Sequence, residues 1–60
     1  MLENYNEIMT EKDIAELLGV SVLQVQKLAQ KGEIPYIRVG RFYRFPKEDF
    51  INHVLKNKNL

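Results

Sequence analysis

The sequence predicts one small α+β domain in which two helices, a β-hairpin and a third helix follow one another. Three observations lead to this order: two short segments of helical periodicity with capping signals, a segment whose apolar residues alternate with a period of two, and a final helical segment. The chain has 60 residues, which leaves room for one domain only. A chain of this length buries only about 60% of its unfolded surface.

The first helix is expected over residues 11–18. Thr10 and Asp13 form a capping-box pair at its start, and Met9 and Ile14 occupy the two staple positions. Gly19 ends the helix, because glycine adopts the left-handed cap conformation at little cost. The apolar stripe of this helix comprises Ile14, Ala15, Leu17 and Leu18. Residues 1–8 are expected to form a flexible arm in front of the domain proper, which spans residues 9–57.

The second helix is expected over residues 22–31, directly after the first. Ser21 and Gln24 repeat the capping-box pattern, and Gly32 stops the helix. The buried face would hold Val25, Leu28 and Ala29. The outer face would carry amides, lysines and one leucine but no acid, namely Leu23, Gln24, Gln26, Lys27, Gln30 and Lys31.

A hairpin is expected between residues 34 and 45, with Val39 paired with Tyr43 around a three-residue tip formed by residues 40–42. In this register one face would bury Ile37, Val39, Tyr43 and Phe45. Arg38 and Arg44 would lie opposite each other on the other face. A two-residue turn would place Ile37 opposite Arg44 and bury a charge, so that register is rejected.

The third helix is expected over residues 47–57, with Pro46 in its first turn. Glu48 and Asp49 complement the positive end of its dipole. Its buried stripe would comprise Phe50, Ile51, Val54 and Leu55. The tail, residues 58–60, is expected to fray.

The composition indicates neither an enzyme nor a metal or cofactor site. The chain has no cysteine, a single histidine (His53) and a single serine (Ser21), whereas hydrolytic and metal sites need several convergent groups. No apolar run approaches the roughly 20 residues of a membrane span, and the N-terminus lacks a signal-peptide pattern. The expected location is the reducing cytoplasm.

Charge is unevenly distributed along the chain. Residues 1–20 hold one base and five acids, a balance of −4, whereas residues 21–60 hold eight bases and three acids, a balance of +5. Such segregation indicates a face that meets a polyanion, although a short chain can also produce it by chance.

Two short helices joined by a tight glycine-containing turn are typical of a helix-turn-helix, whose second helix lies in the major groove of DNA. Ala15, Gly19 and Val25 follow one another at spacings of four and six residues, which suits close helix approach, a turn and a locked second helix. The alternative is an ordinary helical hairpin. The candidate DNA-binding residues of the second helix are Ser21, Val22, Leu23, Gln24, Gln26, Lys27, Gln30 and Lys31.

Residues 9–55 resemble the excisionase and MerR-like helix-turn-helix family, whose members are winged helices. The resemblance is carried by MTEKDIAELLGVS, by GEIPYIRVGRFYRFP and by KEDF at the start of the last helix. It implies double-stranded DNA binding, with the second helix in the major groove and the hairpin, or wing, at the backbone or minor groove. The wing residues that the resemblance places at DNA are Arg38, Gly40, Arg41, Phe42 and Arg44.

Two positions depart from the family pattern. Val22 and Leu23 stand where members usually have polar or basic residues, so they would touch thymine methyls or face a partner. Phe42 stands where a base is usual at the wing tip, so it would act as a minor-groove wedge or as an apolar knob for a neighbouring molecule.

The first functional hypothesis is an excisionase-like architectural factor, which bends an attachment site beside an integrase and associates with the nucleoid when bound. The alternatives are a small transcriptional regulator and a protein-interaction module on the same fold. About four or five phosphate contacts correspond to a salt slope of about −4 and to a nonspecific affinity of roughly micromolar or weaker. The protein is therefore expected to be a monomer in solution that self-associates cooperatively on DNA.

Overall fold

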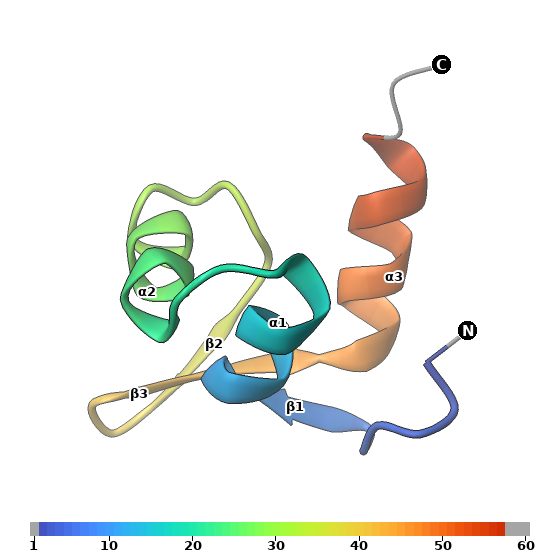
Figure 1. Ribbon diagram of the computed structural model, residues 1–60, viewed down its shortest axis with the longest axis horizontal. Coiled ribbons are helices and arrows are strands. Elements are labelled where there is room, and N and C mark those ends of the chain that lie inside the picture. The colour runs from blue at the N-terminus through green and yellow to red at the C-terminus, as the bar shows by residue number, and fades with distance from the viewer. Residues whose placement is uncertain (1, 58–60) are drawn as a thin grey trace.

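The computed structural model describes residues 2–57 and arranges them as three helices and a three-stranded sheet (Figure 1). The elements in chain order are β1 (Ile8–Thr10), α1 (Glu11–Leu18), α2 (Val22–Gln30), β2 (Ile37–Val39), β3 (Phe42–Pro46) and α3 (Lys47–Lys56). The predicted order of helix, helix, hairpin and helix is confirmed, and a short strand precedes it. The predicted fraying of residues 58–60 falls outside the described residues.

Both capping predictions at α1 are confirmed. The Thr10 hydroxyl accepts a hydrogen bond from the Asp13 amide at 3.1 Å, and the Asp13 carboxylate accepts one from the Thr10 amide at 3.0 Å. Gly19 ends the helix with φ +69°, in the left-handed region that favours glycine. These local interactions explain why the helix begins and ends where the sequence indicates.

The second helix is one residue shorter than expected. The Ser21 hydroxyl caps it by accepting from the Gln24 amide at 3.1 Å. Lys31 is the C-terminal cap rather than a helical residue, and the Gly32 amide donates to the Ala29 carbonyl at 2.9 Å. Only residues 19–21 separate α1 from α2, as a helix-turn-helix requires.

The sheet has the order β1-β3-β2 and is antiparallel throughout, so β3 is its central strand. Met9 of β1 pairs with Phe45 of β3, and both side chains are fully buried. The assignment of Ile8 to a flexible arm was wrong, because Ile8 pairs with Pro46 in β1. A central strand needs a neighbour on each side, and the sequence pattern of three residues was too short to reveal this one.

Residues 2–7 contact α1 and the start of α3. The Tyr5 hydroxyl donates to the Glu16 carboxylate at 2.9 Å, and this hydrogen bond raises the pKa of Tyr5. The Lys47 ammonium donates to the carbonyl oxygens of Leu2 and Tyr5, at 3.3 and 3.0 Å. The flexibility of this arm stays a prediction.

The predicted register of the hairpin was wrong. Val39 pairs with Phe42 and Ile37 pairs with Arg44, so the turn is the two-residue turn that was rejected. That rejection assumed that Ile37 and Val39 face the core, but both are exposed and lie on the outer face of the sheet. Arg44 therefore shares a solvent-facing surface with them and its charge is not enclosed.

The core lies between the inner face of the sheet and the helices. It consists of Met9, Ile14, Ala15, Val25, Ala29, Ile34, Tyr43, Phe45 and Phe50. The predicted stripe of α3 is only partly correct, because Phe50 is buried whereas Val54 and Leu55 are exposed. The reason is that α3 lies against the rest of the protein through its first turns, while its last turns extend beyond it (Figure 1).

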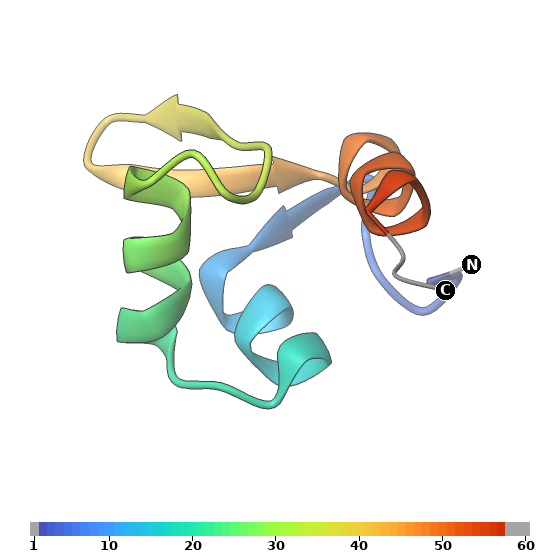
Figure 2. The same ribbon diagram turned by 90° about the horizontal axis from the view of Figure 1, so that it is seen from above.

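Seen from above, α2 and the tip of the β2–β3 hairpin lie at one end of the molecule, and α3 lies at the other (Figure 2). Any partner of α2 and the hairpin can therefore approach without meeting α3.

No helix among residues 2–57 is long and apolar enough to cross a membrane.

Candidate nucleic-acid interface

The outer face of α2 is a continuous exposed surface of mixed chemistry. Leu23 is 60% exposed, and Val22 and Gln24 beside it are exposed as well. Lys27, Gln30 and Lys31 continue this face toward the end of the helix and are also exposed. Ser21 stands at the start of the face, but its hydroxyl is already used as the helix cap.

Gln26 does not lie on this outer face, contrary to the prediction. It is half-buried, and its side-chain amide donates to the Glu11 carboxylate at 2.8 Å. The prediction of an outer position was wrong because successive helical residues are about 100° apart, which places Gln26 only about 60° around α2 from the buried Ala29. Gln26 thus connects α2 to α1 through Glu11, and its contact with DNA stays a prediction.

Glu11, which hydrogen-bonds to α2 and to β3, is a residue whose role the sequence did not predict. It is only 9% exposed, and its second carboxylate oxygen accepts from the Tyr43 amide at 2.9 Å. One side chain at the start of α1 therefore connects that helix to α2 and to β3. No local signal marks this role, because the partners lie 15 and 32 residues away along the chain.

The three wing arginines each contact an aromatic ring or a backbone carbonyl. Arg38 lies over the Tyr43 ring at 5.0 Å, and its guanidinium donates to the Gly40 carbonyl at 3.4 Å. Arg41 and Arg44 lie 5.4 and 5.2 Å from the centre of the Phe42 ring. The Arg44 guanidinium also donates to the Tyr43 carbonyl at 3.0 Å.

Arg38 and Arg44 do not oppose each other across the strands, as had been predicted. Arg38 is opposite Tyr43, and Arg44 is opposite Ile37, so the two arginines point to opposite faces of the sheet. The argument that two like charges directly opposite each other require a polyanion therefore fails. The positive charge of the hairpin is instead spread around both of its faces.

The tip of the hairpin exposes main-chain atoms as well as a charged side chain. Gly40 has φ +62° and is exposed, with open space where a side chain would begin. Arg41 follows it, also exposed. A partner can therefore approach the backbone at Gly40 closely, with the Arg41 side chain beside it.

Together these features define a winged helix-turn-helix, in which α2 is the exposed second helix and the β2–β3 hairpin is the wing. The chain belongs to the helix-turn-helix domain family, a family of DNA-binding domains, and the family model matches residues 8–58. No solved structure matches the chain.

Two curated proteins of Mycobacterium tuberculosis are similar to this chain. They are "Putative DNA-binding protein MT0521" of strain CDC 1551 / Oshkosh and "Putative DNA-binding protein Rv0500A" of strain ATCC 25618 / H37Rv. Each is 40% identical over 38 residues, which are 63% of this chain and 49% of the relative. The match thus spans about half the length of these curated relatives.

Proposed function

We propose that this protein binds double-stranded DNA, with α2 in the major groove and the β2–β3 wing at the adjacent backbone or minor groove. The observation that carries the proposal is that α2, whose outer residues are exposed, and the wing tip lie at the same end of the molecule (Figure 2). Five basic side chains belong to these two elements and their ends, namely Lys27, Lys31, Arg38, Arg41 and Arg44. Helix-turn-helix proteins insert their second helix into the major groove in this way.

On this proposal the first turns of α2 read sequence. Gln24 is exposed and can form paired hydrogen bonds with adenine, while Val22 and Leu23 contact thymine methyl groups. Lys27, Gln30 and Lys31 contact base edges or phosphates further along the helix, and Ser21 lies at the backbone. Gln26 acts indirectly by fixing the position of α2 on Glu11.

The wing contributes charge and an apolar tip. Arg41 and Gly40 approach the phosphates, and Arg38 and Arg44 supply positive charge on either face of the hairpin. Phe42 is 46% exposed although two guanidinium groups flank it. That position suits either insertion into the minor groove or contact with a neighbouring protein molecule.

The biological role that we propose is that of an excisionase-like architectural factor acting beside an integrase or recombinase, on the nucleoid. The exposed apolar wing tip supports it, as does the weak binding expected of one small monomer, because both favour contacts between neighbours on DNA. A transcriptional regulator would use the same DNA-facing residues. Two measurements distinguish these roles: DNA bending at tandem sites, and stimulation of excision by a purified recombinase. Only the architectural factor requires both activities.

The proposal is tested by measuring the dissociation constant for a random duplex at several salt concentrations. We expect roughly micromolar affinity and a salt slope of about −4. Lys27→Ala should weaken binding, whereas Lys56→Ala should not, because Lys56 lies in α3 at the far end of the molecule. The absence of duplex binding at low salt would support the protein-interaction alternative instead.

A further inference from the structure

A groove between α1 and α3 is left over after the core and the proposed DNA face have been assigned. Its volume is about 180 Å³, and every side chain that lines it is apolar. These residues are Leu2, Leu17, Leu18, Phe50, Ile51 and Val54. The groove lies at the end of the molecule that carries α3, away from α2 and the wing tip (Figure 2).

The walls of the groove are not fully covered by the protein itself. Leu18 is 42% exposed on α1, and Val54 is 39% exposed on α3. Leu55, next to Val54, is 54% exposed. An amphipathic helix that leaves its apolar side uncovered beside a groove offers the surface into which another helix packs.

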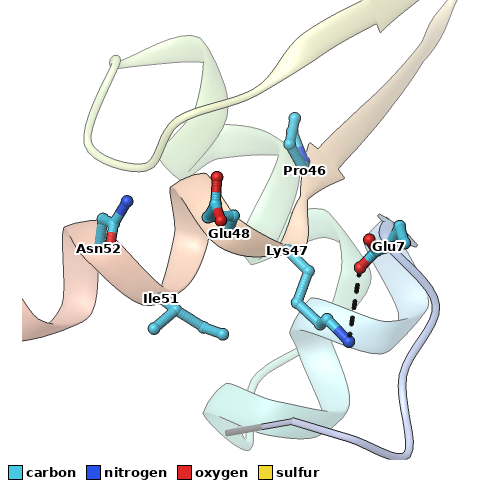
Figure 3. Close-up of a pocket in the computed structure, with 6 residues that line it drawn as sticks. All are labelled: Glu7, Pro46, Lys47, Glu48, Ile51 and Asn52. Atoms are coloured by element: carbon cyan, nitrogen blue, oxygen red, sulfur yellow. Dashed lines mark ion pairs between the residues drawn. The ribbon is translucent and has the colours of Figure 1, made fainter.

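Ile51 also lines a second hollow, of about 410 Å³ (Figure 3). Glu7, Glu48 and Asn52 line this hollow together with Pro46 and Lys47. The Glu7 side chain is 92% exposed. Ile51 is therefore shared by the apolar groove and by a hollow that two carboxylates line.

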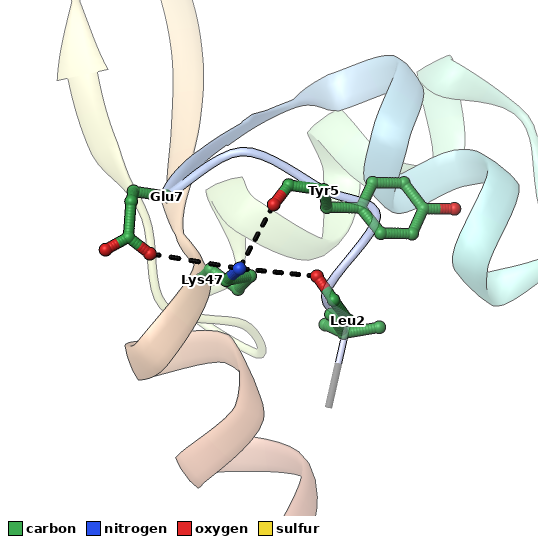
Figure 4. Close-up of polar contacts among 4 residues, drawn as sticks. All are labelled: Leu2, Tyr5, Glu7 and Lys47. Carbon is green, nitrogen blue, oxygen red and sulfur yellow. Dashed lines mark hydrogen bonds and ion pairs between the residues drawn. The ribbon is translucent and has the colours of Figure 1, made fainter.

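The base in this hollow is already engaged. The Lys47 ammonium lies 3.8 Å from the Glu7 carboxylate and donates to two carbonyl oxygens of the N-terminal segment, those of Leu2 and Tyr5 (Figure 4). These bonds hold Leu2 at the groove and direct the positive charge toward the chain's own backbone. The Glu48 carboxylate, on the exposed first turn of α3, is left for a cation from outside.

Charge over the whole N-terminal part points in the same direction. Residues 2–20 supply Leu2, Glu7 and all of α1, and their exposed charged side chains are three acids (Glu3, Glu7 and Glu16) and one base (Lys12). The occupant that suits this surface is therefore apolar along one face and basic around it. DNA is a poor occupant, because its phosphates would meet this negative potential.

We propose that the groove between α1 and α3 docks an amphipathic, basic helix of a partner protein while α2 and the wing remain free. The ten residues of α3 span about 15 Å, which matches about three turns of a docked helix. Apolar side chains spaced i, i+3 or i+4 and i+7 would enter the groove beside Ile51 and Val54, and a lysine or arginine at one end would reach Glu48 and Glu7. This surface does not depend on the DNA-binding proposal.

The test uses a fluorescent synthetic helix with leucines at i, i+3, i+4 and i+7 and lysines elsewhere, added to the full chain. A second peptide replaces every lysine by glutamate. We expect the lysine peptide to bind and to shift the NMR signals of Leu17, Leu18, Ile51 and Val54, and the glutamate peptide to bind at least tenfold more weakly. Val54→Glu should weaken the binding of the lysine peptide at least tenfold, because it places an unpaired carboxylate in an apolar contact.

Val39→Glu is the matched control, since it makes the same change at an exposed valine on the wing. It should leave peptide binding unchanged, while Val54→Glu should leave the circular dichroism spectrum and the affinity for duplex DNA unchanged. Equal binding of both peptides, no binding, or binding that Val54→Glu does not affect would overturn the proposal. Sedimentation showing self-association that Val54→Glu abolishes would overturn it as well, because the occupant would then be a second copy of the chain.

Discussion

Glu11 connects three elements through a single carboxylate. One of its oxygens accepts from the Gln26 side chain and the other from the Tyr43 amide. Hydrogen bonds to a carboxylate are stronger than bonds between neutral groups. The bond to the Tyr43 amide is buried, so water would not take the place of the carboxylate as acceptor. The angle between the two helices and the wing thus depends on a residue that itself lies away from the proposed DNA surface.

Glu11→Ala should lower the free energy of unfolding by about 2–3 kcal/mol, because it leaves the buried Tyr43 amide without its acceptor. Urea denaturation followed by circular dichroism measures this loss. Lys12→Ala changes the exposed neighbour on the same helix and should stay within about 0.5 kcal/mol of the original protein. Similar losses in the two variants would contradict the bridging role of Glu11.

Gln24 and Gln26 have the same side chain, two residues apart, but different surroundings. Gln24→Ala should reduce the preference for a selected cognate site by about 1–3 kcal/mol and leave binding to random DNA nearly unchanged. Gln26→Ala should instead lower stability by about 1 kcal/mol, because it removes the bond to Glu11. Binding titrations on both DNAs decide the matter, and an equal loss on both for Gln24→Ala would show that Gln24 does not read sequence.

The wing is a two-stranded element whose outer face is largely apolar. Ile37, Val39 and Phe42 are exposed there, and Arg44 lies among them. Arg41 and Arg44 keep this surface charged, because their guanidinium groups lie over the exposed ring of Phe42. The hairpin can therefore present positive charge and an apolar tip together.

Arg41→Ala should weaken binding to all duplexes and reduce the magnitude of the salt slope by about 1, because one phosphate contact is lost. The expectation follows from its place at the exposed tip beside Gly40. Titrations of a random duplex at several salt concentrations measure the slope. A slope equal to that of the unaltered protein would mean that the wing tip does not touch phosphate.

At the scale of the whole molecule, the two ends have different chemistry. The end with α2 and the wing tip holds exposed lysines and arginines, and the other end holds α3, the N-terminal segment and an apolar groove with carboxylates beside it. One molecule can therefore contact DNA at one end and a protein at the other. Neighbours along a duplex would meet near the DNA-binding end, where Phe42 is exposed at the wing tip.

Binding to tandem sites should be cooperative. Burying Phe42 against the next molecule would supply about 1.5–3 kcal/mol, which corresponds to a cooperativity factor of roughly ten to one hundred. The same contact should leave the free protein monomeric, because it does not offset the several kcal/mol lost on association in solution. Duplexes with one, two and three sites, titrated with the original protein and with Phe42→Ala, measure the factor.

Leu55→Ala is the control for this series, since Leu55 is 54% exposed, against 46% for Phe42, but lies on α3 at the other end. It should retain full cooperativity. Independent filling of the sites by the original protein would contradict cooperativity itself. Undiminished cooperativity in Phe42→Ala would assign the contact to other residues.

The caps of α1 and the start of α2 could be read from the sequence because they depend on residues no more than four apart, whereas α2 and α3 each end one residue earlier than expected. Each cap joins residues within about one helical turn: Thr10 with Asp13, Ser21 with Gln24, and the Gly19 amide with the Ala15 carbonyl. The residue types at these spacings therefore predict the contacts. The exposed face of α2 followed from its period for the same reason, apart from Gln26. These local interactions also define the turn that makes a helix-turn-helix recognisable.

The strand register, the pairing of β1 and the place of Glu11 were settled only by tertiary packing. Which face of a strand is buried depends on what lies against it, and Ile37 and Val39 lie on the side of the sheet that no helix covers. The partners of Glu11 lie 15 and 32 residues away along the chain, so no local sequence pattern predicts these hydrogen bonds. Val54 and Leu55 are apolar like the core, yet α3 extends past the body of the protein and leaves them uncovered, because the chain has no further element there to cover them among residues 2–57.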